Sequence, residues 1–240
     1  MRPMLRTEFG YNVGMVTRIA VSLEIAPKRT MASVIAWPGW CRGAKTEADA
    51  LAALAAYGPR YGKVIRGVAK DVPGATDVRK LVVKERLAGG AGTEFGVPNL
   101  PLLGDDRPLD DAELQRLTAI LQASWRAFDR AAERADGIEL TKGPRGGGRD
   151  LDKIVGHVSE AEAAYVLQVG SRPPKGDHGS PELMAAIRTA GVAALAERAH
   201  GEEPENASNV KHRWLPRYFV RRSAWHVLDH LWEIEDRAGL

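Results

Sequence analysis

The sequence predicts an α+β protein in which a small N-terminal α/β domain precedes a C-terminal four-helix bundle. Apolar and polar residues alternate in several segments before residue 88, and apolar residues recur at helical spacing after residue 110. A stretch rich in glycine and proline, 89–104, separates the two patterns. We therefore expect one domain over 1–104, which ends in a linker, and a second domain over 105–240.

In the N-terminal domain, the alternation predicts strands over 16–24, 30–37 and 77–87. The WPGW sequence at 37–40 should end the second strand, because proline and glycine interrupt the hydrogen-bond ladder of a sheet. A helix is expected to begin after Thr46, because its hydroxyl suits an N-cap and the acidic residues that follow suit the first turn.

Four helices are predicted in the second half, beginning near Asp110, Asp150, Ser180 and Pro216. Aspartate and serine are favoured N-caps, and the proline after Ser180 suits the first helical position. Apolar residues follow three and four positions apart in these helices. Each helix therefore has one face to bury, which is typical of a four-helix bundle.

Composition limits the classes of partner and compartment. The chain has 240 residues with 34 basic and 31 acidic side chains, and no dense basic stripe, so a nucleic-acid partner is not expected. The single cysteine, Cys41, excludes an internal disulfide framework and favours a reducing, cytoplasmic location. Residues 1–14 lack the apolar core of a signal peptide, and no uncharged apolar run is long enough for a membrane span.

Three histidines form the strongest functional signal. His226 and His230 are four apart on the last predicted helix, which places their Cβ atoms about 5–6 Å apart on one face. His157 lies on an apolar-flanked stripe of the second predicted helix. Together they predict a metal site with an open coordination position, for zinc by default or for nickel or iron. The alternative is that they are ordinary polar residues packed among aromatic side chains.

Two glutamates are candidates for catalysis or for orienting the ligands. Glu160 follows His157 by three residues, and Glu233 follows His230 by three, so each shares a helix face with its histidine. Each could accept a ring N–H or act as a general base; the alternative is a solvated surface carboxylate. A zincin-type peptidase is not favoured, because Val227 occupies the position of its glutamate.

A glycine-rich loop, 142–149, leads into the second helix and contains two arginines. Backbone amides and a helix N-terminus can cradle an anion, so Arg145 and Arg149 are candidates for binding an anionic cofactor or substrate. The loop lacks the lysine and hydroxyl residue of a phosphate-binding loop, and an ordinary flexible connection is the alternative.

For Cys41 and for two tryptophans of the first half, both a structural and a functional role are considered. Cys41 follows a tight turn, but lone cysteines are most often inert and buried. Trp37 and Trp40 could stack on a base or an aromatic ligand, and packing is the competing interpretation.

Segments 152–158 and 222–230 resemble the DinB/YfiT-like superfamily of bacterial four-helix bundles, over residues 110–240. That family typically uses one histidine of the second helix and a His-x-x-x-His pair of the last, and all three positions are histidine here. The family includes transferases and isomerases that use low-molecular-weight thiols. The resemblance therefore implies a divalent-metal-dependent enzyme that acts on a small-molecule substrate. Such bundles often dimerise, so a homodimer is a further expectation.

Segments 37–41 and 46–50 more weakly resemble HicB-like domains, over residues 16–87. These are small partial RNase-H-type α/β folds. The sequence has no helix-turn-helix signal, which argues against an antitoxin. This resemblance supports an alternative function, a non-enzymatic binding or regulatory protein whose first half recognises a partner.

Overall fold

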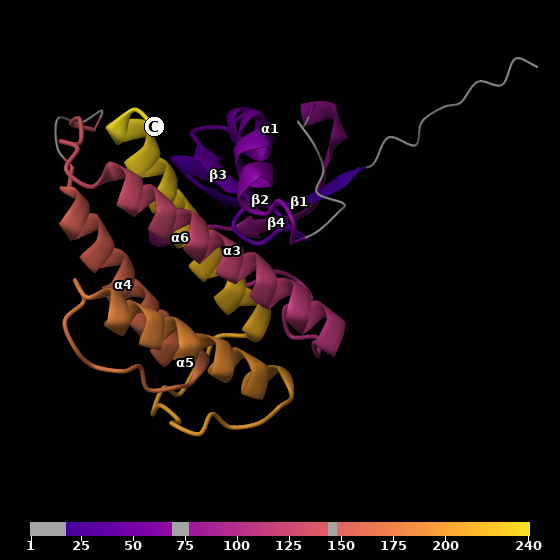
Figure 1. Cartoon of the computed structure of the whole chain (residues 1–240). Coiled ribbons are helices and arrows are strands. Elements are labelled where there is room, and N and C mark those ends of the chain that lie inside the picture. Colours follow the sequence, from indigo (N-terminus) through magenta and orange to yellow (C-terminus); the bar gives the residue numbers. More distant parts are fainter. Residues whose placement is uncertain (1–17, 69–76, 144–147) are drawn as a thin grey trace, which may run out of the picture.

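The computed structural model describes residues 18–68, 77–143 and 148–240, and it shows an α+β chain (Figure 1). A four-stranded mixed sheet with one long helix comes first, and a bundle of four main helices, α3 to α6, follows. The predicted fold class is therefore confirmed. The division of the chain into 1–104 and 105–240 stays a prediction, and residues 1–14 lie outside the described part.

The sheet has the strand order β3-β2-β1-β4. Strands β1 (Ile19–Ala26), β2 (Arg29–Val34) and β3 (Cys41–Ala44) form an antiparallel meander, and β4 (Leu81–Ala88) pairs parallel to β1. The three predicted strands correspond to β1, β2 and β4. Strand β3 was not predicted, because it has only four residues and its signal is its pairing with β2. A 3-10 turn, Val78–Lys80, precedes β4.

Helix α1 (Glu47–Val64) begins as predicted and covers one face of the sheet. The Thr46 side chain accepts a hydrogen bond from the Asp49 backbone N–H at 3.1 Å. Trp40 packs beneath the helix, stacked on Tyr61 with ring centroids 5.4 Å apart, and its Nε1–H donates to the Leu54 carbonyl at 2.8 Å. Only 1% of Trp40 is exposed, so it is a packing residue and not a stacking platform for a ligand.

The segment 89–104, between the sheet and the bundle, is anchored by buried carboxylates and contains a short helix, α2 (Ala91–Glu94). Glu24 of β1 is 6% exposed and accepts hydrogen bonds from the backbone N–H groups of Asn99 at 2.8 Å and Leu100 at 3.2 Å. Asp105 accepts the Leu102 N–H and forms an ion pair with Arg221 of the last helix. Charge-assisted hydrogen bonds of this kind hold the segment against both halves.

The bundle contains α3 (Asp111–Ala135), α4 (Leu151–Val169), α5 (Pro181–Ala199) and α6 (Pro216–Ala238). The first three begin at the predicted caps, whose side chains accept a backbone N–H three residues on: Asp110, Asp150 and Ser180. Both α5 and α6 have proline at the start, as predicted. Among the described residues, no helix is both long and apolar enough to cross a membrane.

Helix α6 packs against the sheet, where its Trp225 forms a buried cluster with Met31 and Cys41, as well as against the other bundle helices. One hydrophobic core contains residues of both halves (Figure 1). The turn before β3 lies directly on α6. Gly39 has φ +89°, and a Cβ there would lie 2.7 Å from Leu228 Cδ1 and 3.1 Å from the Ala224 Cβ. Only glycine satisfies both the backbone conformation and the close approach.

Candidate metal centre

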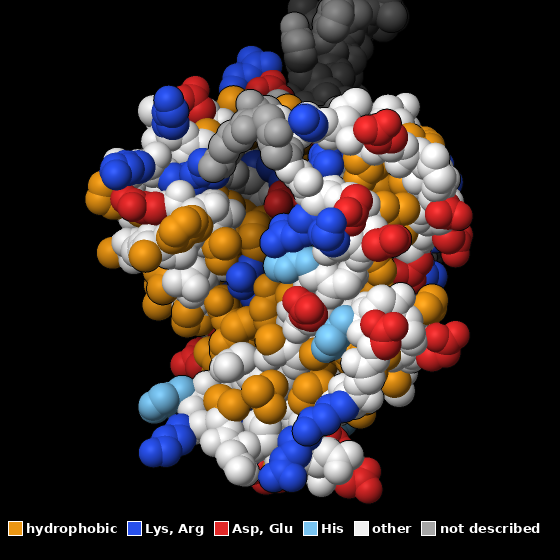
Figure 2. Space-filling view, turned by 90° about the vertical axis from the view of Figure 1, so that its left-hand side faces the viewer, with side chains coloured by type: hydrophobic (Ala, Val, Ile, Leu, Met, Phe, Trp, Pro, Cys, Tyr) orange, Lys and Arg blue, Asp and Glu red, His pale blue; other side chains and the backbone are white. Residues whose placement is uncertain are grey.

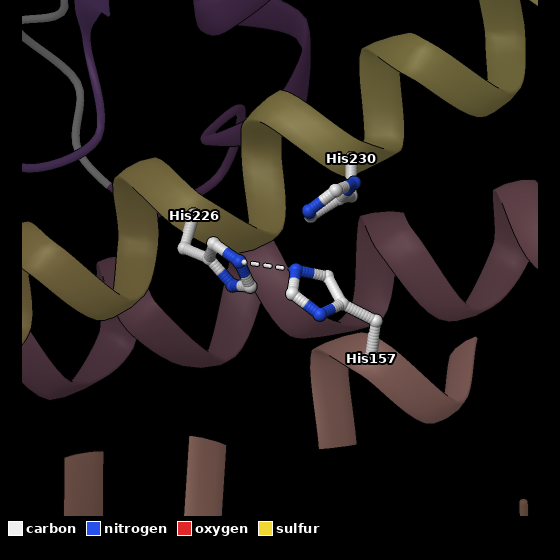
Figure 3. A group of neighbouring side chains, drawn as sticks. All are labelled: His157, His226 and His230. Carbon is white, nitrogen blue, oxygen red and sulfur yellow. Dashed lines mark hydrogen bonds between the residues drawn. The ribbon is translucent and has the colours of Figure 1, made fainter. Parts of the chain in front are cut away.

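The three predicted histidines meet where α4 packs against α6 (Figure 3). His226 and His230 lie one turn apart on α6, and His157 projects toward them from α4. Helix geometry places His226 and His230 on one face of α6, whereas His157 lies near them only because α4 packs against α6. His226 is 7% exposed, and the other two are partly buried. The site is therefore sheltered on the side of His226 and reachable from the other two.

The spacing of the ring nitrogens suits a single ion. One ligand atom from each histidine lies within 4.8 Å of the others. The Nε2 atoms of His226 and His157 are 3.3 Å apart. Two nitrogen ligands about 2.0–2.1 Å from a tetrahedral zinc ion lie roughly 3.3 Å apart, so this pair already has the separation that such an ion needs. The same approach also permits a long N–H···N hydrogen bond when no ion is bound.

A carboxylate orients the third ring. Glu233 Oε2 lies 2.8 Å from His230 Nδ1, and Glu233 Oε1 accepts from Arg237 Nη1 at 2.7 Å. With its proton on Nδ1, His230 presents the Nε2 lone pair to an ion, and Figure 3 shows a ring nitrogen of His230 directed toward the other two rings. Arg237 is fixed in turn, because its Nε–H donates to the Thr141 carbonyl at 2.8 Å.

Electrostatics keep two of the rings neutral. Burial, followed by the charges of His230 and Arg222, lowers the pKa of His226 from 6.5 to about 2. Burial and the charge of His230 also lower the pKa of His157. The hydrogen bond with His230 lowers the pKa of Glu233, which therefore stays ionised. Neutral imidazoles beside an ionised outer carboxylate are the protonation states that metal binding requires.

The other residues that the sequence suggested for a site differ in how they lie relative to the histidines. Glu160 is exposed, and its charge acts on His157 only from a distance. Arg149 is exposed just before the cap of α4, and its charge contributes to the lowered pKa values of both His157 and His226. Arg145 lies outside the described residues. Cys41 is buried, and burial raises the pKa of its thiol to about 12, so it stays protonated at neutral pH.

The described end of the glycine-rich loop contacts the outer part of the site. Gly148 has φ +150°, and a Cβ there would lie 2.6 Å from Arg237 Nη2. Arg237 thus lies between this loop and Glu233. Arg237 was not predicted from the sequence, although its spacing of four residues from Glu233 on one helix is a usable signal.

Aromatic side chains and one arginine enclose the inner edge of the site. The rings of Tyr165 and Trp225 lie 5.6 Å and 6.1 Å from the His226 ring. Arg222, one turn before His226 on α6, stacks on both aromatic rings. Figure 2 shows histidine side chains at the surface beside an apolar hollow. No sequence signal singled out Arg222 or Tyr165.

Comparison of the chain with protein-family models, with curated proteins and with solved structures gave no match. The geometry of the histidines and their neighbours is therefore the support for a metal site.

Proposed function

We propose that the chain is a divalent-metal-dependent enzyme whose ion is held by His157, His226 and His230. The observation that carries this proposal is the 3.3 Å separation of two Nε2 atoms, with a ligand atom of the third ring within 4.8 Å of both. Three protein ligands leave at least one position of the ion open, which is the arrangement of catalytic rather than structural zinc sites. Zinc is the first candidate, and nickel or iron fits the same ligands.

The chain's own residues have definable roles at this site. Glu233 holds the proton on His230 Nδ1, and Arg237 keeps that carboxylate charged and oriented. Burial keeps His226 in its neutral, ligating form. When bound, a divalent ion with an open position lowers the pKa of a coordinated water or thiol. The lowered pKa of Glu233 fits an orienting carboxylate better than a general acid.

The resemblance of α4 and α6 to the DinB/YfiT-like pattern supports a thiol as the second reactant. All three histidine positions of that pattern are filled here. We therefore propose transfer or isomerisation of a small electrophilic substrate with a low-molecular-weight thiol. The alternative of partner recognition through the first half gains no support from Trp40, which is buried.

The decisive experiment is metal content by plasma mass spectrometry on tag-free protein. We expect roughly one ion per chain, and its loss in a His226→Ala/His230→Ala variant. A His212→Ala variant is the matched control, because His212 is exposed in a loop and should leave the metal content unchanged. Absence of bound metal after incubation with zinc, nickel and ferrous iron would overturn the proposal.

The enzymatic part is tested separately on the metal-loaded protein. We expect turnover of a small electrophile only when a small thiol is added, and loss of that turnover in the double histidine variant. A fully loaded protein that stays inactive across a panel of thiols and electrophiles would retain the metal site but contradict the thiol-dependent reaction.

A further inference from the structure

A cavity of about 210 Å³ lies where the end of β2, the 102–107 segment and the first turns of α3 and α6 meet. It has room for several water molecules, and so also for a small ligand. Among the described residues that line it, none is a histidine of the metal centre. Arg217, which does line it, lies about 13 Å from His226 along the axis of α6, at a rise of about 1.5 Å per residue. The cavity is therefore separate from the metal centre.

The charged side chains around this cavity do not balance one another. Four arginines and two carboxylates line it: Arg107, Arg116, Arg217, Arg221, Asp105 and Glu113. One arginine holds both oxygens of each carboxylate: Arg217 binds Glu113, and Arg221 binds Asp105. Both carboxylates are thus committed, and the other two arginines leave the lining with an excess of two positive charges.

The two remaining arginines form no ion pair with a carboxylate of the described residues. Arg116 Nη1 donates to the Ala36 carbonyl at 3.0 Å, and its Cζ lies 5.3 Å from the ring centroid of Trp37. Arg107 Nε donates to the Gly104 carbonyl at 3.2 Å. A guanidinium has five N–H donors, so both arginines keep donors for a further acceptor. Arg116 is partly exposed and Arg107 is exposed, so these donors are accessible.

The acidic residues near the start of α3 do not supply that acceptor. The Asp110 carboxylate is the N-cap and accepts the Glu113 N–H at 2.8 Å. Asp111 Oδ1 lies 3.2 Å from His200 Nε2. Neither aspartate lines the cavity, and Asp106, which is exposed, does not line it either. An anion from outside the chain is therefore the acceptor that the two arginines suit.

Apolar side chains form another part of the lining: Ile35, Pro38, Leu102, Leu103 and Leu117. Leu103 is 83% exposed, so a ligand in the cavity can cover it. An apolar wall with a few placed charged groups is typical of a site for a small organic molecule.

We propose that this cavity binds a small phosphate monoester, with the phosphate on Arg107 and Arg116 and the apolar body against Leu103. A phosphate monoester carries a charge of about −1.5 to −2 at pH 7, which matches the excess charge of the lining. Its oxygens also match the fork of a guanidinium. A carboxylate would neutralise only one of the two arginines. The site needs no metal, so it is independent of the proposed function.

The test compares two probes of similar shape and different charge by isothermal titration calorimetry of the full chain. Phenyl phosphate is close to a dianion at about pH 7.5, whereas benzenesulfonate is a monoanion with the same ring. We expect phenyl phosphate to bind about tenfold or more tightly, because it engages both arginines. Arg116→Gln should weaken phenyl phosphate binding by about tenfold or more. Arg130→Gln removes an exposed arginine of the same helix and should leave the affinity unchanged.

Two further variants assign the parts of the ligand. Arg107→Gln changes an exposed residue and should weaken both phenyl phosphate and inorganic phosphate. Leu103→Ser should weaken phenyl phosphate more than inorganic phosphate, because only the former has an apolar body to bury. Equal losses for the two ligands in Leu103→Ser would overturn the position of that body.

The wild-type titration alone can refute the inference, even if a variant fails to fold. Absence of phenyl phosphate binding, or equal affinity for phenyl phosphate and benzenesulfonate, would overturn it. The His226→Ala/His230→Ala variant should bind phenyl phosphate as the wild type does, and loss of binding there would place the phosphate on the metal instead. Loss in Arg149→Gln with full binding in Arg116→Gln would place it on the glycine-rich loop and would also overturn the inference.

Discussion

Two arginines beside α6 are stacked on aromatic rings but differ in their acidic partners. On the side of the sheet, Arg42 of β3 lies 3.6 Å from the ring centroid of Tyr57 and 4.1 Å from that of Trp232, and its Nη1 pairs with Asp229 at 2.9 Å. Arg222 of α6 stacks on Trp225 and on Tyr165 of α4, and among the described residues no carboxylate forms an ion pair with it. Each arginine has one buried nitrogen without a hydrogen-bond partner among the described residues, Arg42 Nε and Arg222 Nη1, so the carboxylate is what distinguishes them.

The difference concerns which arginine joins two elements of the fold through an ion pair. A stacked arginine with its own carboxylate fixes two elements of the fold, here β3 and α6. A stacked arginine without one is held by its aromatic neighbours, and no carboxylate of the described residues depends on it.

The largest expected effect is the contrast between Arg42→Met and Arg222→Met. Methionine keeps the unbranched stem of arginine but removes the charge. Arg42→Met should lower the free energy of unfolding by about 1–3 kcal/mol, because it removes the stacked cation and leaves Asp229 unpaired. Arg222→Met should lower it by about 1 kcal/mol or less, because it also removes a stacked cation but leaves no carboxylate without a partner.

Urea unfolding followed by circular dichroism measures both values. A loss at Arg222 as large as that at Arg42 would mean that both arginines are structural, and the distinction between them would fail. Metal content of both variants serves as a control, because neither substitution removes a histidine.

Local signals account for the helices of the bundle. Asp110, Asp150 and Ser180 were recognisable as caps because an N-cap acts on a backbone N–H only three residues away. The pairing of His226 with His230 is local in the same sense. Strand β3 escaped prediction because its stability comes from pairing with β2, and its four residues include a glycine.

The parts of the site that depend on tertiary packing were predicted unevenly. His157 was proposed as the third ligand from its apolar-flanked stripe and from the family resemblance, and the packing of α4 on α6 brings it to the pair. Spacing placed Glu160 and Glu233 on the faces of their histidines, yet only Glu233 makes the contact. Spacing cannot reveal the unpaired state of Arg222, because that depends on every element packed around it.

The next largest expected effect is on metal affinity, and it should differ between Glu233 and Glu160, the two carboxylates predicted to act at the site. Glu233→Gln keeps an acceptor near His230 Nδ1 but removes the charge that Arg237 also pairs with. We expect the zinc affinity to fall about tenfold or more, as for other outer carboxylates of metal sites. Competition with a chromogenic chelator measures the change.

Glu160→Gln is the matched control for that measurement. Glu160 is exposed, and we expect its removal to leave the zinc affinity within about twofold. Equal losses in the two variants would mean that net charge, and not the hydrogen bond to His230, governs the affinity.

The smallest expected effect concerns a paired arginine at the start of α6. Arg217 Nε–H donates to Glu113 Oε1 of α3 at 2.9 Å, and this hydrogen bond lowers the pKa of Glu113. A carboxylate whose folded pKa is depressed stabilises the protein above its unfolded pKa, about 4.3, and loses that contribution as the pH falls through the folded value. Glu113→Gln should therefore reduce stability at pH 7 by less than about 1 kcal/mol, because Glu113 is one-third exposed.

The pH dependence of that loss is what tests the pairing of Arg217. Urea unfolding of the wild type and of Glu113→Gln should converge as the pH falls below about 4, where the wild-type carboxylate also becomes neutral. If the difference in free energy of unfolding between the wild type and Glu113→Gln stayed constant with pH, the loss of stability would come from packing and not from the charge of Glu113. The same series on Arg222→Met should show no convergence in this range, because no acidic side chain among the described residues pairs with Arg222. A convergence there would reveal a carboxylate partner within the chain and would make Arg222 a structural residue like Arg42.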